Sequence, residues 1–164
     1  MDDAKLKLTL SRFLDGKWTG AKRLQGLQGG ALPYLLALVA EQGQRPILVI
    51  TATAQDAENL SDDLTLFLGE DQTLPPLRRR LHLLPSWEVL PFEKLSPHPE
   101  TLAARLEGLY KLIEEPAPIL ISTPAALMQK VIPRESLKQS YLYLVAGQEL
   151  QREVLTEHLI QWGF

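Results

Sequence analysis

The sequence contains no cysteine, and its only imidazoles are three histidines in 164 residues. The missing cysteines exclude disulfides, thiolate catalysis and thiolate metal sites. His82, His98 and His158 are scattered along the chain and lack the spacing of a metal-binding motif. We therefore expect neither a metal centre nor thiol chemistry.

The sequence also lacks any apolar run long enough to span a membrane. Its start, MDDAKLKLTL, begins with acidic residues and has no apolar signal-peptide core. The formal net charge of −3 gives no reason to expect strong binding to nucleic acid or to an anionic membrane by the chain as a whole. These absences predict a cytoplasmic protein without membrane contact.

What the sequence does have is a regular alternation of strand-like and helix-like segments, with 45% hydrophobic and 23% charged residues. Such alternation is typical of a parallel α/β sheet covered by helices. Two runs, PILVITAT and APILIST, are apolar throughout and predict strands that are buried on both faces. Helices are expected around 6–14 and over 32–42, 54–68, 99–115 and 124–132, and strands over 22–24, 46–53, 81–85 and 117–123.

Two of these helices have a predicted inner face. Apolar spacing in the helix over 54–68 points Ala57, Leu60, Leu64 and Phe67 inward, with Thr53 as its cap. In the helix that Pro99 opens, the apolar face consists of Leu102, Leu106, Leu109 and Tyr110.

The character of the sequence changes after Pro133. SLKQSYLYLVAGQEL alternates in a way that predicts a strand, with Tyr141, Tyr143 and Val145 opposite Leu142 and Leu144. QREVLTEHLIQWGF predicts an amphipathic helix. One strand and one helix cannot bury these apolar faces alone. We therefore divide the chain into an α/β domain over residues 1–133 and the start of a truncated α+β subdomain over 134–164.

The stretch GLQGGALP has the form of a phosphate-binding turn that opens a helix. Gly26, Gly29 and Gly30 could form the turn, but a working P-loop also needs a lysine for the phosphates and a hydroxyl for magnesium. Leu32 and Pro33 occupy these two positions. The alternatives are a turn that needs small residues for packing, which we favour, and an atypical nucleotide site.

The remaining polar clusters each have a functional and a structural interpretation. Arg78, Arg79 and Arg80 form a basic run that is either a contact surface or, as we favour, a solvated charge run.

His98 could pair with Ser96 or Glu100 in catalysis, but no nucleophile elbow accompanies them. We favour Ser96 or His98 as a helix cap, with Trp87 and Phe92 pinning the loop to the core.

Asp62 and Asp63 lie on a polar helix face and lack the preceding apolar strand of a magnesium-binding Walker B aspartate.

One long stretch, SWEVLPFEKLSPHPETLAARLEGLYKLI, strongly resembles the N-terminal module of the bacterial transcription-repair coupling factors, Mfd. ISTPAALMQKVIP and YLYLVAGQEL are similar to later strands and helices of that module, and the resemblance runs from about Gly20 to the end. The matching signature residues are Trp87, Glu88, Leu90, Pro91, Phe92, Ser96, Pro97, His98, Arg105, Leu106, Leu109 and Tyr110.

The resemblance implies a RecA-like domain similar to the first domain of the helicase UvrB, with a degenerate P-loop that does not hydrolyse ATP. Leu32 and Pro33 agree with this. UvrB's aromatic β-hairpin for DNA has only the short LPFEKLSPHPE in its place.

The resemblance also implies a function, that of a non-catalytic scaffold that helps to recruit UvrA in transcription-coupled nucleotide excision repair. It places the UvrA-contacting arginines beyond this chain, so no UvrA-binding residue is carried over. It places RNA polymerase, DNA and ATP with Mg²⁺ on downstream domains of an ATP-dependent DNA translocase, with no cofactor in this fragment. The alternative is a small P-loop nucleotide-binding protein or NTPase with an atypical loop.

Overall fold

The computed structural model describes residues 23–42, 45–70, 79–89, 92, 95–139, 142, 144 and 146–161. The chain divides into two compact units, Met1–Lys130 and Val131–Phe164, which are described here one at a time. The helix predicted around residues 6–14 and most of the strand predicted over 22–24 lie outside the described residues. Residues 23 and 24 of that strand are described and are not part of a strand.

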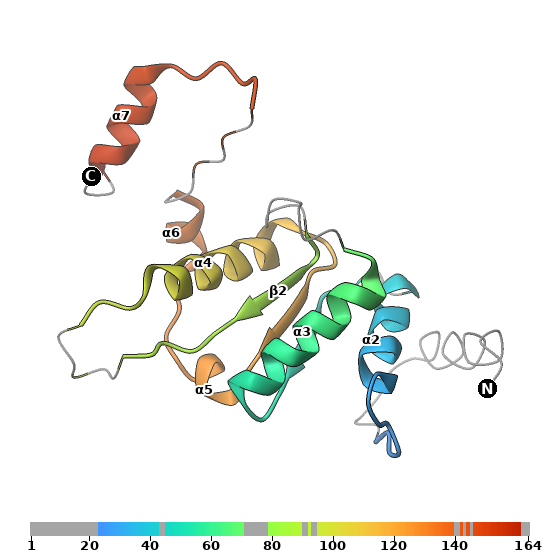
Figure 1. Ribbon diagram of the computed structural model, residues 1–164. Helices are drawn as coiled ribbons and strands as arrows, with labels where there is room; N and C mark the ends of the chain where they lie inside the picture. Colours follow the sequence, from blue (N-terminus) through green and yellow to red (C-terminus); the bar gives the residue numbers. More distant parts are fainter. Residues whose placement is uncertain are drawn as a thin grey trace. The chain divides into compact units, whose positions relative to one another are not determined.

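The first unit is built on a sheet of three parallel strands, β1 (Ile47–Ile50), β2 (Leu81–Leu84) and β3 (Ile119–Ser122). Their spatial order is β1-β3-β2, so the last strand in sequence lies in the middle (Figure 1). Ile47 of β1 and Leu81 of β2 are both aligned with Ile119 of β3. The predicted α/β class with a parallel sheet flanked by helices is confirmed.

The helices of this unit begin where the sequence supplies caps or proline. They are α2 (Ala31–Gln42), α3 (Ala54–Leu68), α4 (Pro99–Glu114) and α5 (Pro124–Leu127). The Thr53 hydroxyl accepts the Asp56 N–H at 3.1 Å, and Gly69 ends α3 in the left-handed conformation with φ 62°. Thr123 caps α5 in the same way, through the Ala126 N–H at 3.3 Å. Because each cap follows directly on β1 or β3, the sequence turns sharply from strand to helix.

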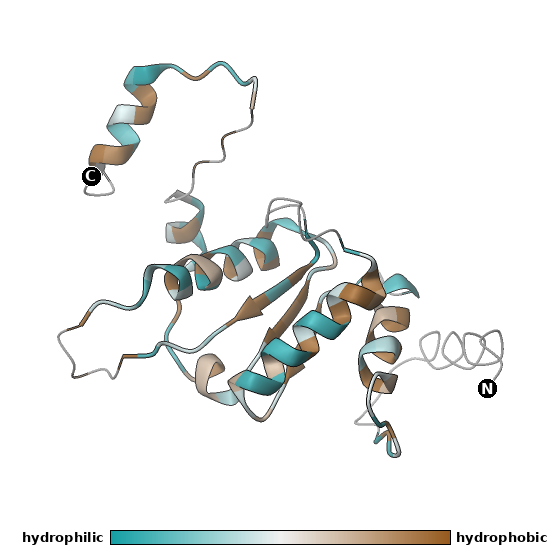
Figure 2. Cartoon of the chain, in the orientation of Figure 1, coloured by the Kyte–Doolittle hydropathy of each residue, from teal (hydrophilic) through white to brown (hydrophobic). Residues whose placement is uncertain are grey.

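One face of the sheet is covered by α2 and α3. The core cluster joins Ala37 and Ala40 of α2 and Leu60 and Leu64 of α3 to the sheet residues Leu81, Ile119 and Ile121. In Figure 2, the brown of hydrophobic residues covers the strands and parts of these two helices. Phe67, which was predicted to point inward, is 39% exposed, whereas Ala57, Leu60 and Leu64 are buried as predicted.

The other face is covered by α4, but not through the apolar residues that the sequence suggested. Its buried residues are Thr101, Arg105, Gly108 and Lys111, while Leu102 is 42% exposed. A Cβ placed on Gly108 would lie 3.0 Å from the Cδ1 of Leu120 on β3. Of the other residues of the predicted inner face, Leu106, Leu109 and Tyr110 are half-buried. The prediction missed the most buried positions, because the helix approaches the sheet through its glycine and the polar residues on either side of it.

The prediction that the strand at 46–53 is buried on both faces was also wrong. Leu48 and Ile50 of β1 are 51% and 55% exposed, and the strand alternates between half-buried and exposed residues. β1 lies at one side of the described sheet and pairs only with β3 among the described strands. By contrast, β3 pairs on both sides and is buried at every residue.

The second unit contains α6 (Arg134–Gln139) and α7 (Arg152–Gln161). A helix is present near the end of the chain as predicted, as α7, but it has no buried face within the described residues. The strand predicted from SLKQSYLYLVAGQEL was wrong at residues 136–139, which belong to α6, and at Leu142 and Leu144, which are not in a strand. Tyr141, Tyr143 and Val145 lie outside the described residues. The interpretation of this unit as the start of a longer subdomain stays a prediction.

The contact between Gly108 and Leu120 can be tested by substitution. Gly108→Val places two methyl groups where a single Cβ already crowds Leu120, so we expect a loss of about 1–3 kcal/mol in the free energy of unfolding. Urea denaturation followed by circular dichroism measures this loss. Leu102→Val introduces the same β-branched residue on the exposed side of α4 and is the control. Equal losses in the two variants would contradict the assignment of the inner face.

Candidate functional site

The glycine turn leads from an exposed segment into α2. Gly26 and Gly29 have φ values of 81° and 55°, in the left-handed region that glycine adopts without strain. A Cβ placed on either would meet nothing within 4 Å, so the backbone conformation, and not crowding, requires glycine there. Gly30 differs, because its Cβ would lie 3.4 Å from the ring of Phe67 on α3.

The start of α2 offers few donors to a phosphate. A phosphate site at a helix N-terminus depends on backbone N–H groups that are free to point at the anion. The Ala31 N–H donates to the Gln28 carbonyl at 3.2 Å, and Pro33 has no N–H. Leu32, whose side chain is 40% exposed, cannot supply a charge. Among the first three residues of the helix, this leaves only the N–H of Leu32 to point at an anion.

The end of the turn packs against α3. Phe67 lies against Gly30 and also meets the ring of Tyr34 edge to face, with the ring centroids 5.7 Å apart. This contact holds the first turn of α2 on α3. Such an arrangement is what the structural interpretation of the glycine-rich sequence requires.

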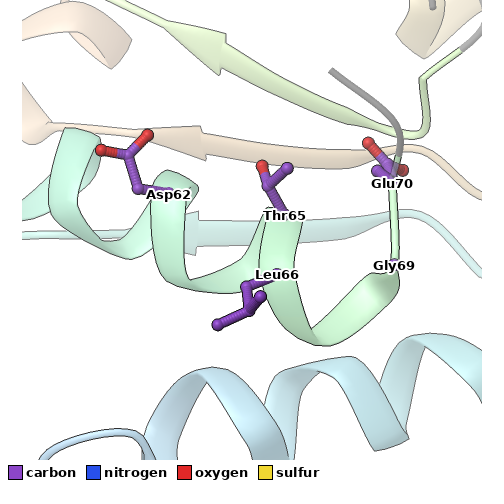
Figure 3. A pocket seen from close by; sticks show the side chains of 5 residues that line it. All are labelled: Asp62, Thr65, Leu66, Gly69 and Glu70. Atoms are coloured by element: carbon purple, nitrogen blue, oxygen red, sulfur yellow. The ribbon is translucent and has the colours of Figure 1, made fainter. Parts of the chain in front are cut away.

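The aspartates Asp62 and Asp63 lie on the exposed side of α3, not at the end of a strand. Asp62 borders a hollow of about 340 Å³ at the C-terminal end of α3, together with Thr65, Leu66, Gly69 and Glu70 (Figure 3). The Thr65 hydroxyl donates to the Ser61 carbonyl at 2.8 Å, so it serves the helix. The hollow holds two carboxylates but no paired nucleophile and base, and we assign it no catalytic role.

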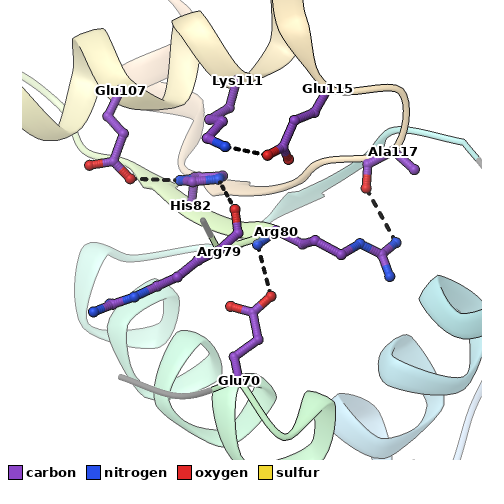
Figure 4. A network of polar contacts seen from close by, with 8 residues as sticks. All are labelled: Glu70, Arg79, Arg80, His82, Glu107, Lys111, Glu115 and Ala117. Carbon is purple, nitrogen blue, oxygen red and sulfur yellow. Dashed lines mark hydrogen bonds and ion pairs between the residues drawn. The ribbon is translucent and has the colours of Figure 1, made fainter. Parts of the chain in front are cut away.

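The basic run contributes to the packing of the first unit. Arg80 donates its backbone N–H to Glu70 at 2.9 Å, and its Nη2 lies 3.3 Å from the Ala117 carbonyl (Figure 4). The same Nη2 lies 3.2 Å from the Ala40 carbonyl. Its guanidinium therefore joins the C-terminal part of α2 to the segment that leads into β3. Arg78 lies outside the described residues, and the contact surface expected for the run stays a prediction.

His82 of β2 lies in the same polar network and is 4% exposed. Its Nε2 is 2.8 Å from the Arg79 carbonyl, and its Nδ1 is 2.8 Å from a carboxylate oxygen of Glu107 on α4. The carbonyl can only accept, so Nε2 is the donor in its hydrogen bond with Arg79. Both ring nitrogens are thereby engaged, and His82 is a link between sheet and helix, not a free base.

The signature residues after β2 form the N-terminal cap of α4. His98 occupies the cap position, but its side chain makes no capping bond. Instead Glu88 accepts the His98 N–H at 3.3 Å with one oxygen and the Thr101 hydroxyl with the other. The Thr101 hydrogen bond, followed by smaller contributions from His98, lowers the pKa of Glu88 from its ordinary 4.5 although partial desolvation opposes this.

Three more residues hold the loop after β2 to α4 and to the end of α5. The Arg105 guanidinium stacks on the Trp87 ring, 4.4 Å from its centroid, and its Nη1 donates to the Pro85 carbonyl. Gln129 accepts the Trp87 N–H at 2.8 Å and the Arg105 Nη1 at 3.3 Å. Burial lowers the pKa of Arg105, which nevertheless stays charged. Thr101 and Gln129 were not singled out from the sequence, because both find their partners through distant contacts.

Two residues of the proposed catalytic pairing, His98 and Glu100, lie near one another at the surface. His98 Nδ1 and Glu100 are 3.9 Å apart, and both side chains are largely exposed. Ser96 and Pro97 precede the helix in an extended segment, and Ser96 is exposed. Phe92 is 80% exposed and does not pin the loop to the core as predicted, whereas Trp87 does pack through Arg105. Pro91 lies outside the described residues.

Within the described ranges, no group of three or more histidine, aspartate or glutamate side chains could hold a metal ion. In the same ranges, no helix combines the length and the apolar character that crossing a membrane requires.

The Glu88 cap makes stability depend on pH. Because the folded-state pKa lies below the ordinary 4.5, the ionised carboxylate stabilises the fold above pH 4.5, and this contribution is lost as the pH falls through the folded-state pKa. We expect Glu88→Gln to lower the free energy of unfolding at pH 7, with the difference from wild type shrinking below pH 4.5. Urea denaturation across this range measures it.

Thr101→Val is the matched variant, since it removes the largest cause of the shift. The Glu88 carboxyl, followed by carbon-13 NMR, should then titrate at a higher pH than in wild type. An unchanged titration in Thr101→Val would contradict the hydrogen bond as the cause.

No protein-family model matches the sequence. Curated proteins do match it, and all those found are named transcription-repair-coupling factor. The protein of Escherichia coli (strain K12) is 34% identical over 146 residues, which are 88% of this chain and 12% of that protein. Those of Myxococcus xanthus and Bacillus subtilis (strain 168) are 31% and 28% identical over 143 and 154 residues, again 12% of each protein.

The match covers nearly the whole of this chain, including the loop after β2 and the residues that cap and anchor α4. The chain spans only about 12% of the length of these curated relatives. Over 88% of its length the chain is therefore similar to a part of the transcription-repair-coupling factors.

Proposed function

We propose that this chain is a non-catalytic scaffold module of a transcription-repair-coupling factor, derived from a P-loop domain. The observation that carries this proposal is the opening of α2. Leu32 and Pro33 stand where a lysine and a hydroxyl would hold phosphate and magnesium, and the Ala31 N–H is engaged within the turn. The turn keeps its glycines for backbone conformation and for packing on Phe67.

The proposed role of the whole protein follows from its family. Within a longer polypeptide, the module would help to bring UvrA to stalled RNA polymerase in transcription-coupled nucleotide excision repair. The ATP-dependent translocation on DNA would belong to other domains. The fold supports this division, since the polar residues at the carboxyl edge of the sheet are engaged in caps and loop contacts.

The alternative function, a nucleotide-binding protein with an atypical loop, differs in one measurable respect. We expect titration of ATP with Mg²⁺ into the chain to give no heat and no change in tryptophan emission at micromolar concentrations. The physical reason is that the turn lacks a cation, that the Ala31 N–H is engaged within it and that Pro33 has no N–H. Saturable micromolar binding would refute the scaffold interpretation of the turn.

A double substitution tests whether the two lost side chains are the whole defect. Leu32→Lys with Pro33→Thr restores the lysine, the hydroxyl and one N–H. We expect no ATP hydrolysis from this variant, because Asp62 and Asp63 lie on an exposed helix face and cannot position the metal. Turnover above the wild-type background, measured as phosphate release, would show that the catalytic apparatus is intact.

The recruitment role is tested with purified UvrA. We expect a longer polypeptide of the same protein to retain UvrA in a pull-down and residues 1–164 alone to retain none, since the resemblance places the contacting arginines further along the chain. Equal retention by both would place the contact surface within this chain. Failure of the longer polypeptide to bind would remove the recruitment role, without affecting the conclusion about the glycine turn.

A further inference from the structure

Among the described strands, β1 has one free hydrogen-bonding edge. Its other edge is used by β3, because the N–H groups of Ile47 and Thr51 donate at 2.9 Å each to carbonyl groups on the β3 side. Successive peptide groups of a strand point to alternate sides, so the N–H and C=O groups of Leu48 and Ile50 point away from β3. No other strand of the described sheet pairs with them.

The side chains at this edge are apolar and open to solvent. Leu48 and Ile50 are 51% and 55% exposed, and Leu48 points to the same face of the sheet as Leu120, its register partner. The helix α4 packs on that face through the contact of Gly108 with Leu120, and it leaves the two β1 side chains exposed. Charged side chains normally protect an edge strand from pairing with another molecule, but residues 46–55 carry no charge.

An antiparallel pairing of β1 with β1 of a second copy satisfies the outward groups of both residues. A two-fold axis perpendicular to the sheet at Val49 places Leu48 opposite Ile50 of the second copy, and the reverse. Because the N–H and C=O groups of both residues point outward, each of these two pairs exchanges two hydrogen bonds. The apolar side chains become cross-strand neighbours on one face, so their exposed surface is reduced.

The charges that flank β1 are complementary in this pairing. Arg45 lies four residues before Val49, so it is opposite Thr53 of the second copy, which lies four residues after Val49. The Thr53 hydroxyl donates to Asp56 at 2.7 Å, and a carboxylate therefore lies beside that position. Arg45 and Asp56 are both exposed, and the two-fold symmetry makes the contact twice. One chain thus carries both halves of the contact, which identifies a second copy as the occupant of the edge.

We propose that β1 is a self-association edge, through which two copies of the chain join their sheets into one continuous sheet with an antiparallel pair at its centre. The peptide groups of Leu48 and Ile50 provide the hydrogen bonds, and Arg45 with Asp56 fixes the register. The inference does not depend on the proposed scaffold function.

Sedimentation of the 164-residue chain over a dilution series tests the association. We expect a reversible equilibrium between monomer and dimer. Hydrogen exchange at the same dilutions, followed by NMR, then locates the contact, because the amides of Leu48 and Ile50 should exchange more slowly as the dimer forms. The Val49 amide is the internal control, since it points to β3 and should respond little to concentration.

The charged contact is tested by reversal. Arg45→Glu turns each of the two symmetric attractions into a repulsion, so we expect a dimer about tenfold weaker. Arg45→Lys keeps the charge and should associate nearly as well as the wild type. Arg152→Glu is the matched control, because it makes the same change of charge at an exposed residue of the second unit and should have no effect.

Leu48→Lys tests the strand itself. It places a charge on the exposed edge, and we expect this variant to stay monomeric, with circular dichroism showing that it is folded. If it does not fold, the Arg45 variants and the hydrogen exchange of the wild type still decide the question.

Four results would each overturn the proposal. The chain could stay monomeric up to its solubility limit, or it could form a dimer that Arg45→Glu leaves unchanged. A dimer without slower exchange at Leu48 and Ile50 would place the contact elsewhere. Slow exchange of these amides at every concentration would show that another segment of the same chain covers the edge.

Discussion

The central constraint on the first unit is the burial of β3 on both faces and along both edges. Every residue from Ile119 to Ser122 is buried, and the strand pairs with β1 on one side and with β2 on the other. A strand in this position has no solvent-facing side, so each face of the sheet requires a layer of helix. The layer of α2 and α3 meets this requirement with alanine and leucine. The same constraint brings the Ser122 hydroxyl onto the Leu84 carbonyl at 2.9 Å, which satisfies a polar group inside the sheet.

On the other face of the sheet, the layer is α4, and its residues nearest the sheet are mostly polar. Gly108 lets α4 approach Leu120 closely, and the residues one turn away on either side of that contact are Arg105 and Lys111, both nearly fully buried. Buried charges must be paired or stacked to be tolerated. Lys111 pairs with Glu115, and Arg105 stacks on Trp87. Most of the polar contacts that define the loop after β2 are therefore consequences of how closely this helix lies on the sheet.

The sequence predicted the location of these elements because their signals are local. Apolar runs mark the three strands, and Thr53, Pro99 and Thr123 mark helix starts. The inner face of α4 could not be predicted, since it depends on the close approach of Gly108 to Leu120 on β3, a strand that comes later in the sequence. The exposure of Leu48 and Ile50 was missed because an apolar run does not show how many neighbours a strand has.

For the candidate site, the sequence correctly located the turn before α2, but its glycines alone could not decide between ancestry and function. Gly26 and Gly29 are required by their positive φ, whereas a Cβ on Gly30 would lie in ordinary van der Waals contact with Phe67. Neither observation involves a phosphate, so the backbone path accounts for Gly26 and Gly29 without a ligand. Evidence for a ligand has to come from donors without partners. At the start of α2, one donor is engaged in the turn and one is missing, whereas Arg105 has two buried donors that nothing in the described chain satisfies. Among the described residues, the buried side-chain donors without partners thus lie at Arg105, beside the loop after β2, and not at the turn whose glycines suggested a site.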